Sequence, residues 1–227
     1  MKVKIKDKRL VSKEILLVQF DLLGQPFPSM SGQFFSLTLI NPPYTDERGN
    51  SRKFGFTNSP TVQDSISMMT RIGVSAFKKS LLELPIGTEV EIDGVDGHNH
   101  LPDDVQIQFV WIADAIGIAP FMSIVREIKA KNLQNKVTLV YITKNQEEAV
   151  FTQELTEYAN ENSLFKFIPI ISEANVFNPD LIKQFQDLRN SLYVITGEQN
   201  FVIPAFKILK EIQIEAKNIA MEIFTGY

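Results

Sequence analysis

Short runs of alternating apolar and polar residues fill the first hundred positions of the chain. Val3 and Ile5, for example, alternate with lysines. Every second side chain of a β-strand lies on the same face, so this period predicts half-buried strands. Gly, Pro, Asn and Asp separate the runs and favour turns. The predicted strands are the one beginning at Val3, then Ile15–Phe20, Phe34–Ile40, Lys53–Thr57, Ile66–Arg71 and Glu89–Ile92, a pattern typical of an antiparallel sandwich or barrel.

One segment of this half has a helical period instead. Between Ser75 and Leu84, the residues Phe77, Leu81 and Leu84 recur at the spacing of one helix face. Ser75 precedes the run, and its hydroxyl suits the N-cap position. The sequence therefore predicts a short helix that starts just after Ser75.

Strands and helices alternate in the second half, which indicates a parallel sheet with right-handed crossovers. A linker at residues 101–107 predicts domains of residues 1–100 and 101–227. The predicted strands are Phe109–Ala113, Val137–Ile142, Phe165–Ile171, Leu192–Ile195 and Ile219–Phe224, and the predicted helices are Pro120–Lys131, Glu148–Glu161, Pro179–Leu188 and Ile203–Ile214.

The amino-acid composition limits the kinds of functional site and partner that the chain can have. The 227 residues include no cysteine, which excludes disulfides, a cysteine nucleophile and a thiolate-held iron–sulfur cluster in this chain. His98 and His100 alone predict no metal site. The net charge of −4 argues against a nucleic-acid partner. No apolar run is long enough to span a membrane, and the first residues predict no signal peptide, so we expect a cytoplasmic protein.

The segment that begins Arg52-Lys53-Phe54-Gly55 resembles the arginine–x–aromatic–serine flavin motif of the ferredoxin–NADP reductase family. A guanidinium binds phosphate through a planar set of donors, and a side chain two residues along lies on the same face. The resemblance implies that Arg52 holds the flavin phosphate and Phe54 packs on the isoalloxazine. Gly55 replaces the serine, and its backbone N–H could bond flavin N5. The implied contacts include Lys53 and continue through Phe56, Thr57 and Asn58. An exposed arginine beside a core phenylalanine remains the alternative.

The start of the predicted helix carries a second part of the resemblance. Free N–H groups there favour an anion, and the family places its flavin pyrophosphate at this point. The contacts would come from Thr70, Arg71, Gly73, Val74 and Ser75. A plain capped helix is the alternative.

A third segment, Ala113 to Pro120, follows a buried strand and opens a helix, which is the context of a phosphate-binding turn. It resembles the nicotinamide-nucleotide loop of the same family. Asp114 and Ala115 stand where the family has two glycines. The contacts would come from Asp114, Gly117, Ala119 and Pro120, and an ordinary strand-to-helix turn is the alternative.

Three further positions complete the resemblance. Thr196 and Gly197 follow a strand where the family has Cys-Gly, which places Thr196 beside the nicotinamide. The terminal Tyr227 matches an aromatic residue that covers the flavin. Lys144 lies where family members bind the adenosine ribose and would meet a 2′-phosphate. A simple strand end is the alternative for Thr196 and a frayed tail for Tyr227. Near Lys144, Glu147 and Glu148 equally suit the free hydroxyls of NAD, and a solvated helix start is a further explanation of these acids.

Together these segments imply a six-stranded antiparallel β-barrel followed by a Rossmann-like parallel α/β domain. The resemblance further implies an NAD(P)H-dependent flavoprotein reductase. Bound FAD, preferred over FMN, would take electrons from NADPH or NADH and pass them to a separate ferredoxin, flavodoxin or oxygenase component. Gly55, Thr196 and Tyr227 would lie at the reacting atoms. The alternative function is a flavin-binding module with impaired nicotinamide turnover, acting as an assembly subunit or redox sensor.

Overall fold

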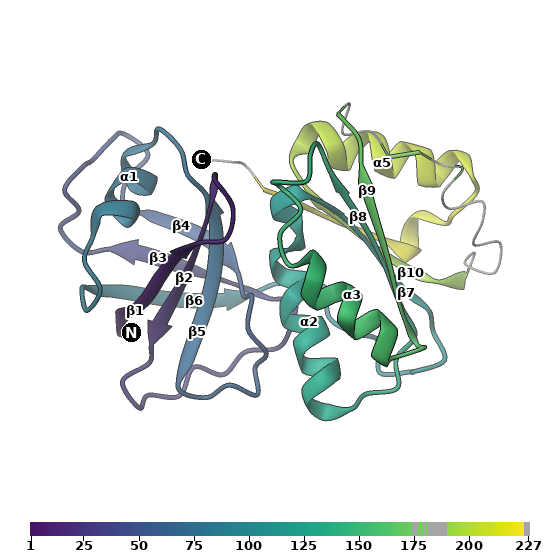
Figure 1. Ribbon diagram of the computed structural model, residues 1–227, viewed down its shortest axis with the longest axis horizontal. Coiled ribbons are helices and arrows are strands. Elements are labelled where there is room, and N and C mark those ends of the chain that lie inside the picture. Colours follow the sequence, from purple (N-terminus) through teal and green to yellow (C-terminus); the bar gives the residue numbers. More distant parts are fainter. Residues whose placement is uncertain (174–176, 179, 181–189, 225–227) are drawn as a thin grey trace. The chain divides into compact units, whose positions relative to one another are not determined.

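The structure is a computed structural model that describes residues 1–173, 177, 178, 180 and 190–224. The chain forms two compact units (Figure 1). The first unit contains Met1–His100 together with Ala119–Asn132. The second contains Leu101–Ile118 together with the described residues from Leu133 onward.

An antiparallel sheet of six strands forms the first unit. Its order is β4-β3-β6-β1-β2-β5, as predicted for an antiparallel all-β domain. Just beyond β4, the backbone N–H of Thr57 donates to the carbonyl of Ser67 in β5 over 2.8 Å, which draws the two edges together. The strands are β1 (Lys2–Leu10), β2 (Ile15–Asp21), β3 (Phe34–Leu39), β4 (Ser51–Gly55), β5 (Ser65–Arg71) and β6 (Glu89–Asp96).

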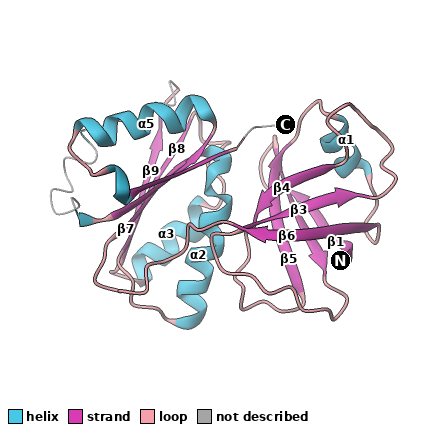
Figure 2. Cartoon of the chain, turned by 180° about the vertical axis from the view of Figure 1, so that it is seen from behind, coloured by secondary structure: helices cyan, strands magenta, loops and turns pink. Residues whose placement is uncertain are grey.

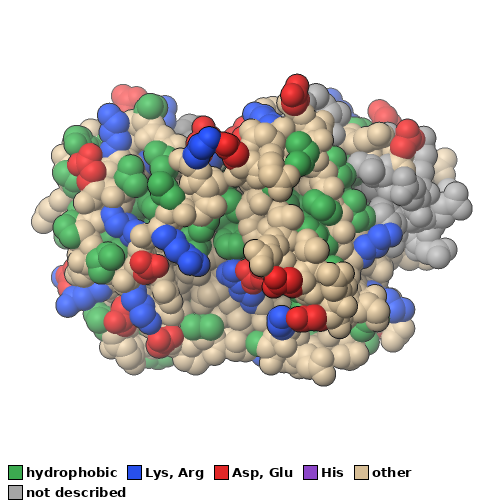
Figure 3. Space-filling model, in the orientation of Figure 1, with side chains coloured by type: hydrophobic (Ala, Val, Ile, Leu, Met, Phe, Trp, Pro, Cys, Tyr) green, Lys and Arg blue, Asp and Glu red, His purple; other side chains and the backbone are tan. Residues whose placement is uncertain are grey.

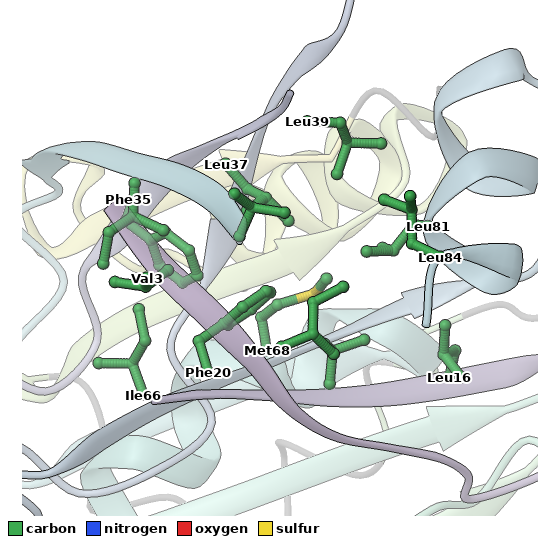
Figure 4. Close-up of a cluster of buried hydrophobic side chains, with 14 of the residues drawn as sticks. Val3, Leu16, Phe20, Phe35, Leu37, Leu39, Ile66, Met68, Leu81 and Leu84 are labelled. Atoms are coloured by element: carbon green, nitrogen blue, oxygen red, sulfur yellow. The ribbon is translucent and has the colours of Figure 1, made fainter. Parts of the chain in front are cut away.

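The inward side chains of this sheet make a continuous apolar core (Figure 4). Phe20, Phe35 and Leu37 are fully buried, and each such side chain contributes about 1.5–3 kcal/mol through its burial. Helix α1 (Ala76–Glu83) closes the core with Phe77 and Leu81. The periodicity prediction for this helix is confirmed, since Ser75 is its N-cap and the hydroxyl accepts the N–H of Lys78 over 3.4 Å.

The other end of α1 is capped by a side chain from β1. The Lys8 ammonium donates to the carbonyls of Leu81 at 3.0 Å, Leu82 at 2.7 Å and Leu84. These are among the carbonyls that a helix leaves without internal partners at its C-terminus, so a cation there is stabilising. Partial burial lowers the pKa of Lys8.

A parallel sheet with order β11-β10-β7-β8-β9 forms the second unit (Figure 2). The order changes direction after β9, and with right-handed crossovers this places α3 and α5 on opposite faces. Every residue of β7 is buried accordingly. The strands are β7 (Phe109–Asp114), β8 (Val137–Thr143), β9 (Phe165–Ile171), β10 (Leu192–Gly197) and β11 (Ile219–Ile223); the described helices of this unit are η1 (Ala115–Gly117), α3 (Thr152–Glu161), α5 (Gln199–Glu211) and η3 (Ala216–Asn218). Helix α2 (Ile118–Lys131) follows η1 along the chain but, from Ala119 onward, belongs to the first unit.

Helix boundaries depart from the predictions in three places. Helix α2 begins at Ile118, two residues before Pro120, because the 3₁₀ turn η1 leads into it. Helix α3 begins only at Thr152, since Phe151 has a left-handed backbone (φ 61°) that interrupts a helix. Helix α5 begins at Gln199, before the predicted start. The predicted helix at residues 179–188 lies outside the described residues.

On the face shown in Figure 3, Lys and Arg side chains are interspersed with Asp and Glu. Among the described helices, none combines the length and the apolar character needed to cross a membrane.

Candidate functional site

Arg52 and Phe54 lie on the same side of β4. They pair with Leu37 and Phe35 of β3, and directly opposed residues of an antiparallel pair share a face. This direction brings both side chains to α1. The guanidinium lies over the ring of Phe77, 5.3 Å from its centroid, and the Phe54 ring is 5.8 Å from the same ring. The Arg52 side chain is only 12% exposed.

Some N–H donors of the Arg52 guanidinium have no hydrogen-bond partner among the described residues. Its Nη1 donates to the carbonyls of Arg48 at 2.9 Å, Gly49 at 3.2 Å and Ser51 at 2.6 Å. Its Nε and Nη2 are buried and have no hydrogen-bond partner among the described residues. Buried donors are normally satisfied, so two that are not point to a ligand.

A carboxylate lies between these donors and α1. Asp46 accepts the N–H of Ala76, the first residue of α1, on Oδ2 at 3.0 Å. Its Oδ1 is 3.9 Å from Nη2 of Arg52. The guanidinium and the start of α1 therefore face one anionic group, which is the arrangement an anion site requires. The motifs identified Arg52 and Ser75 but missed Asp46.

The residues before α1 divide into two groups. Val74 is 91% exposed, and Gly73 lies beside the Lys78 side chain, so both offer surface near the start of the helix. Thr70 is buried and its hydroxyl donates to the carbonyl of Arg71 at 3.3 Å. Arg71 pairs with Glu14 at 3.5 Å. Thr70 and Arg71 thus hold neighbouring strand residues in this structure.

The residues that follow Phe54 pack and form hydrogen bonds within the first unit. Phe56 is 2% exposed, with its ring 4.8 Å from that of Phe35. Thr57 is fully buried and its hydroxyl bonds that of Ser67 at 2.6 Å; Asn58 accepts the Ser67 N–H at 2.6 Å. The side chains of Phe56 and Thr57 are thus buried within the first unit, and their contacts with a flavin stay a prediction.

Lys53 and Gly55 lie on the other side of β4 from Arg52. The Lys53 ammonium is 4.8 Å from the Phe34 ring and 3.9 Å from Asp96. A Cβ at Gly55 would meet Pro120 of the first unit, 3.0 Å from its Cδ. This packing explains why glycine replaces the family's serine. Helix α2 is also held beside the segment that follows β4, since Arg126, in the second half of the helix, donates to the carbonyl of Thr57.

In the second unit, the Asp114–Gly117 turn is shaped by close packing. Asp114 is buried, and its Oδ2 lies 3.5 Å from the N–H of Glu198. A Cβ at Gly197 would come within 2.6 Å of Asp114 Cβ, and one at Gly117 within 2.7 Å of the Thr196 carbonyl carbon. The Asp114 carboxylate is thus directed at the end of β10.

Ala115 has a left-handed backbone. Its φ is 37°, in a region that glycine adopts without strain. The turn therefore contains a strained alanine. Ala119 and Pro120 follow it and are both buried, whereas Lys144 is exposed at the carboxyl end of β8.

Thr196 is committed to the protein interior. It is fully buried; its hydroxyl accepts the indole N–H of Trp111 at 2.6 Å and donates to the carbonyl of Gly117 at 2.8 Å. Both hydrogen bonds direct the hydroxyl to neighbouring protein groups, and the contact of Thr196 with a nicotinamide stays a prediction. Thr196 holds the turn. Tyr227 lies outside the described residues.

No metal-binding cluster was expected. Over the part of the chain that the structure describes, no group of three or more His, Asp or Glu side chains is placed to hold a metal ion.

Comparisons with known proteins agree with this architecture. A model of the oxidoreductase NAD-binding domain family matches residues 112–197, from β7 through the end of β10. The ferredoxin-NADP+ reductase from Plasmodium falciparum superimposes with a TM-score of 0.81, over 98% of this chain and 95% of that one, at 20% identity. The chain therefore has the fold of ferredoxin–NADP reductases, and residues 112–197 match the oxidoreductase NAD-binding domain family.

Curated relatives of this ferredoxin–NADP reductase-like chain include parts of oxygenase systems. The reductase component of phenol 2-monooxygenase from Pseudomonas sp. is 24% identical over 67% of the chain, which spans only 42% of that relative. Reductase component 1 of terephthalate 1,2-dioxygenase from Comamonas sp. is 19% identical over 97% of the chain and 67% of its own length. The family resemblance drawn from the motifs is thereby confirmed.

Proposed function

We propose that the chain is an NAD(P)H-dependent flavoprotein reductase that transfers electrons through bound FAD to a separate acceptor. The observation that carries this proposal is the pair of buried, unsatisfied Arg52 nitrogens facing the start of α1. That pair fits a diphosphate, because a phosphate accepts from both a guanidinium and helix N–H groups. Residues 1–100 would form the flavin-binding domain and residues 101–227 the nucleotide-binding domain.

Each proposed contact has a physical role. Arg52, Ser75 and the neighbouring residues of α1 would neutralise the flavin diphosphate, and Phe54 would support the ring system. The backbone N–H of Gly55 is the donor proposed for flavin N5, since no side chain is available there. A flavin bound here would accept two electrons from a nicotinamide and release them singly.

The turn from Asp114 to Pro120 is the proposed site of the nicotinamide nucleotide. Its support is the left-handed backbone at Ala115 and the start of a helix at Ile118. The exposed Lys144 at the end of β8 is the proposed partner of a 2′-phosphate, which favours NADPH.

The acceptor is proposed to be a separate protein. The chain has no cysteine and so cannot hold a thiolate-bound cluster of its own. The two curated relatives are named as reductase components of oxygenases, which supports an oxygenase component over ferredoxin or flavodoxin.

A second candidate is a flavin-binding module with impaired nicotinamide turnover, acting as an assembly subunit or redox sensor. The specific observation that favours it is Thr196, whose hydroxyl is occupied by Trp111 and Gly117.

One experiment separates the two candidates. The purified protein is denatured and the released cofactor identified, and the native protein is mixed anaerobically with NADH and with NADPH. Prompt loss of the 450 nm flavin band, on the order of seconds, supports the reductase; enzymes commonly turn over at about 10 per second. A flavin that stays oxidised supports the module. A protein that neither contains nor takes up flavin contradicts both.

A further inference from the structure

The loop between β3 and β4 is fastened along α1. The backbone N–H of Tyr44 donates to the Ser80 hydroxyl at 3.0 Å, and that hydroxyl donates back to the Tyr44 carbonyl at 3.1 Å. The Tyr44 phenol also donates to the Glu83 carboxylate at 3.0 Å, a bond that raises the pKa of Tyr44. These bonds attach the loop beside the C-terminal half of the helix.

Asp46 attaches the same loop at the opposite end of α1. Besides the Ala76 N–H at 3.0 Å, its carboxylate accepts the N–H of Arg48 at 3.0 Å. The side chain is 30% exposed, whereas Arg52 beside it is 12% exposed. The carboxylate therefore lies at the mouth of the anion site, where it uses the helix donor that a phosphate oxygen needs.

We propose that Asp46 is an internal competitor for the flavin diphosphate and thereby sets how tightly the chain retains its cofactor. This inference rests on the proposed function. In the flavin-free chain, Asp46 holds the start of α1 and partly neutralises Arg52. When the diphosphate binds, the carboxylate must leave the Ala76 N–H, because one donor cannot serve two anions at full strength.

The negative charge of Asp46 opposes binding of the diphosphate even after the carboxylate has left the Ala76 N–H. Two anions near one guanidinium repel each other, and helix N-terminal interactions with a single charge amount to a few tenths to about 2 kcal/mol. Asparagine keeps the shape and the carbonyl acceptor for the Ala76 N–H but removes the charge. Asp46→Asn should therefore preserve the helix start and favour the diphosphate.

The test compares wild type, Asp46→Asn and Glu47→Gln, all stripped of flavin. Glu47 is an exposed carboxylate of the same loop, so its variant is matched in net charge and position. Each protein is titrated with FAD, FMN and riboflavin, with flavin fluorescence and calorimetry as readouts. Asp46→Asn should lower the Kd of FAD and FMN about tenfold and leave riboflavin, which has no phosphate, unchanged. Glu47→Gln should match wild type.

Three outcomes overturn the inference. If Asp46→Asn binds FAD no more tightly than wild type, Asp46 is a helix-capping residue only. If riboflavin gains as much as FAD, or Glu47→Gln gains equally, the effect is not competition at the diphosphate. If no protein binds any flavin, the proposed function fails as well, and the two failures are thereby distinguished.

A second variant and probe cover the case in which Asp46→Asn does not fold. Asp46→Ser keeps a short acceptor without charge. Inorganic diphosphate, added to the flavin-free proteins, should raise the melting temperature of Asp46→Ser more than that of wild type. Equal shifts contradict the inference.

Discussion

The indole N–H of Trp111 donates to the hydroxyl of Thr196 over 2.6 Å, and the same hydroxyl donates to the Gly117 carbonyl. This chain of bonds crosses from the centre of β7 through β10 to the turn before α2. Thr196, at the position where the family has cysteine, thus holds the turn at Gly117 in place through its hydroxyl.

Thr196→Val should lower the free energy of unfolding by about 1–3 kcal/mol, because it leaves the Trp111 donor and the Gly117 acceptor buried without partners. Thr196→Ser, which retains the hydroxyl, should lose less. Urea denaturation measures both. Equal losses would show that the methyl group matters more than the bonds.

Arg52→Ala should raise the Kd of FAD about 10- to 100-fold, the range expected for hydrogen bonds to a charged group. Arg9→Ala is the matched control, since Arg9 is an exposed arginine of β1 outside the predicted flavin contacts. Titration of the flavin-free proteins decides the question. Equal flavin affinity of the Arg52 variant and wild type would remove Arg52 from the site.

Ala115→Gly should raise the free energy of unfolding by up to about 1 kcal/mol, as it relieves a left-handed alanine (φ 37°) at some cost in chain entropy. Ala130→Gly, at an exposed position of α2, should instead lower that energy by about 1 kcal/mol. Thermal unfolding compares the two signs. Destabilisation by both changes would mean that the turn is not strained.

Stability should fall in alkaline solution through Tyr193. Burial raises the pKa of this phenol well above 10, whereas in the unfolded chain it ionises near 10. Above about pH 10 the folded state holds more protons than the unfolded state, so the free energy of unfolding decreases with pH. Tyr193→Phe should flatten this decline relative to wild type. The lowered pKa of Lys8 acts in the opposite direction and is common to both proteins. Urea denaturation at pH 8 through 11 measures the slopes, and parallel slopes would contradict this assignment.

Residue patterns predicted the elements well where one period dominates. The alternation in Phe165–Ile171 and the spacing of Phe77 and Leu81 identified β9 and α1, because burial of one face decides such segments. The late start of α3 was not predictable, because phenylalanine is not a residue type that indicates the left-handed backbone found at position 151.

The candidate site was predictable only in part. Arg52 and the start of α1 followed from motif spacing, and the structure brings them together through Phe77 and Asp46. Asp46 itself was missed because its role depends on how a loop folds back on a helix. The direction of Asp114 and the bonds of Thr196 likewise depend on strand neighbours that are distant in sequence.

The hydrogen bonds from Lys8 to the carbonyls of α1 connect the first strand with a helix that is distant in the sequence. Lys8 and Leu81 are 73 residues apart, yet this contact secures the helix whose opposite end receives an anion. In a chain whose first strand has not yet joined the sheet, α1 would therefore be frayed and its N-terminus would bind phosphate more weakly. Cofactor uptake should accordingly follow, rather than precede, completion of the sheet during biosynthesis.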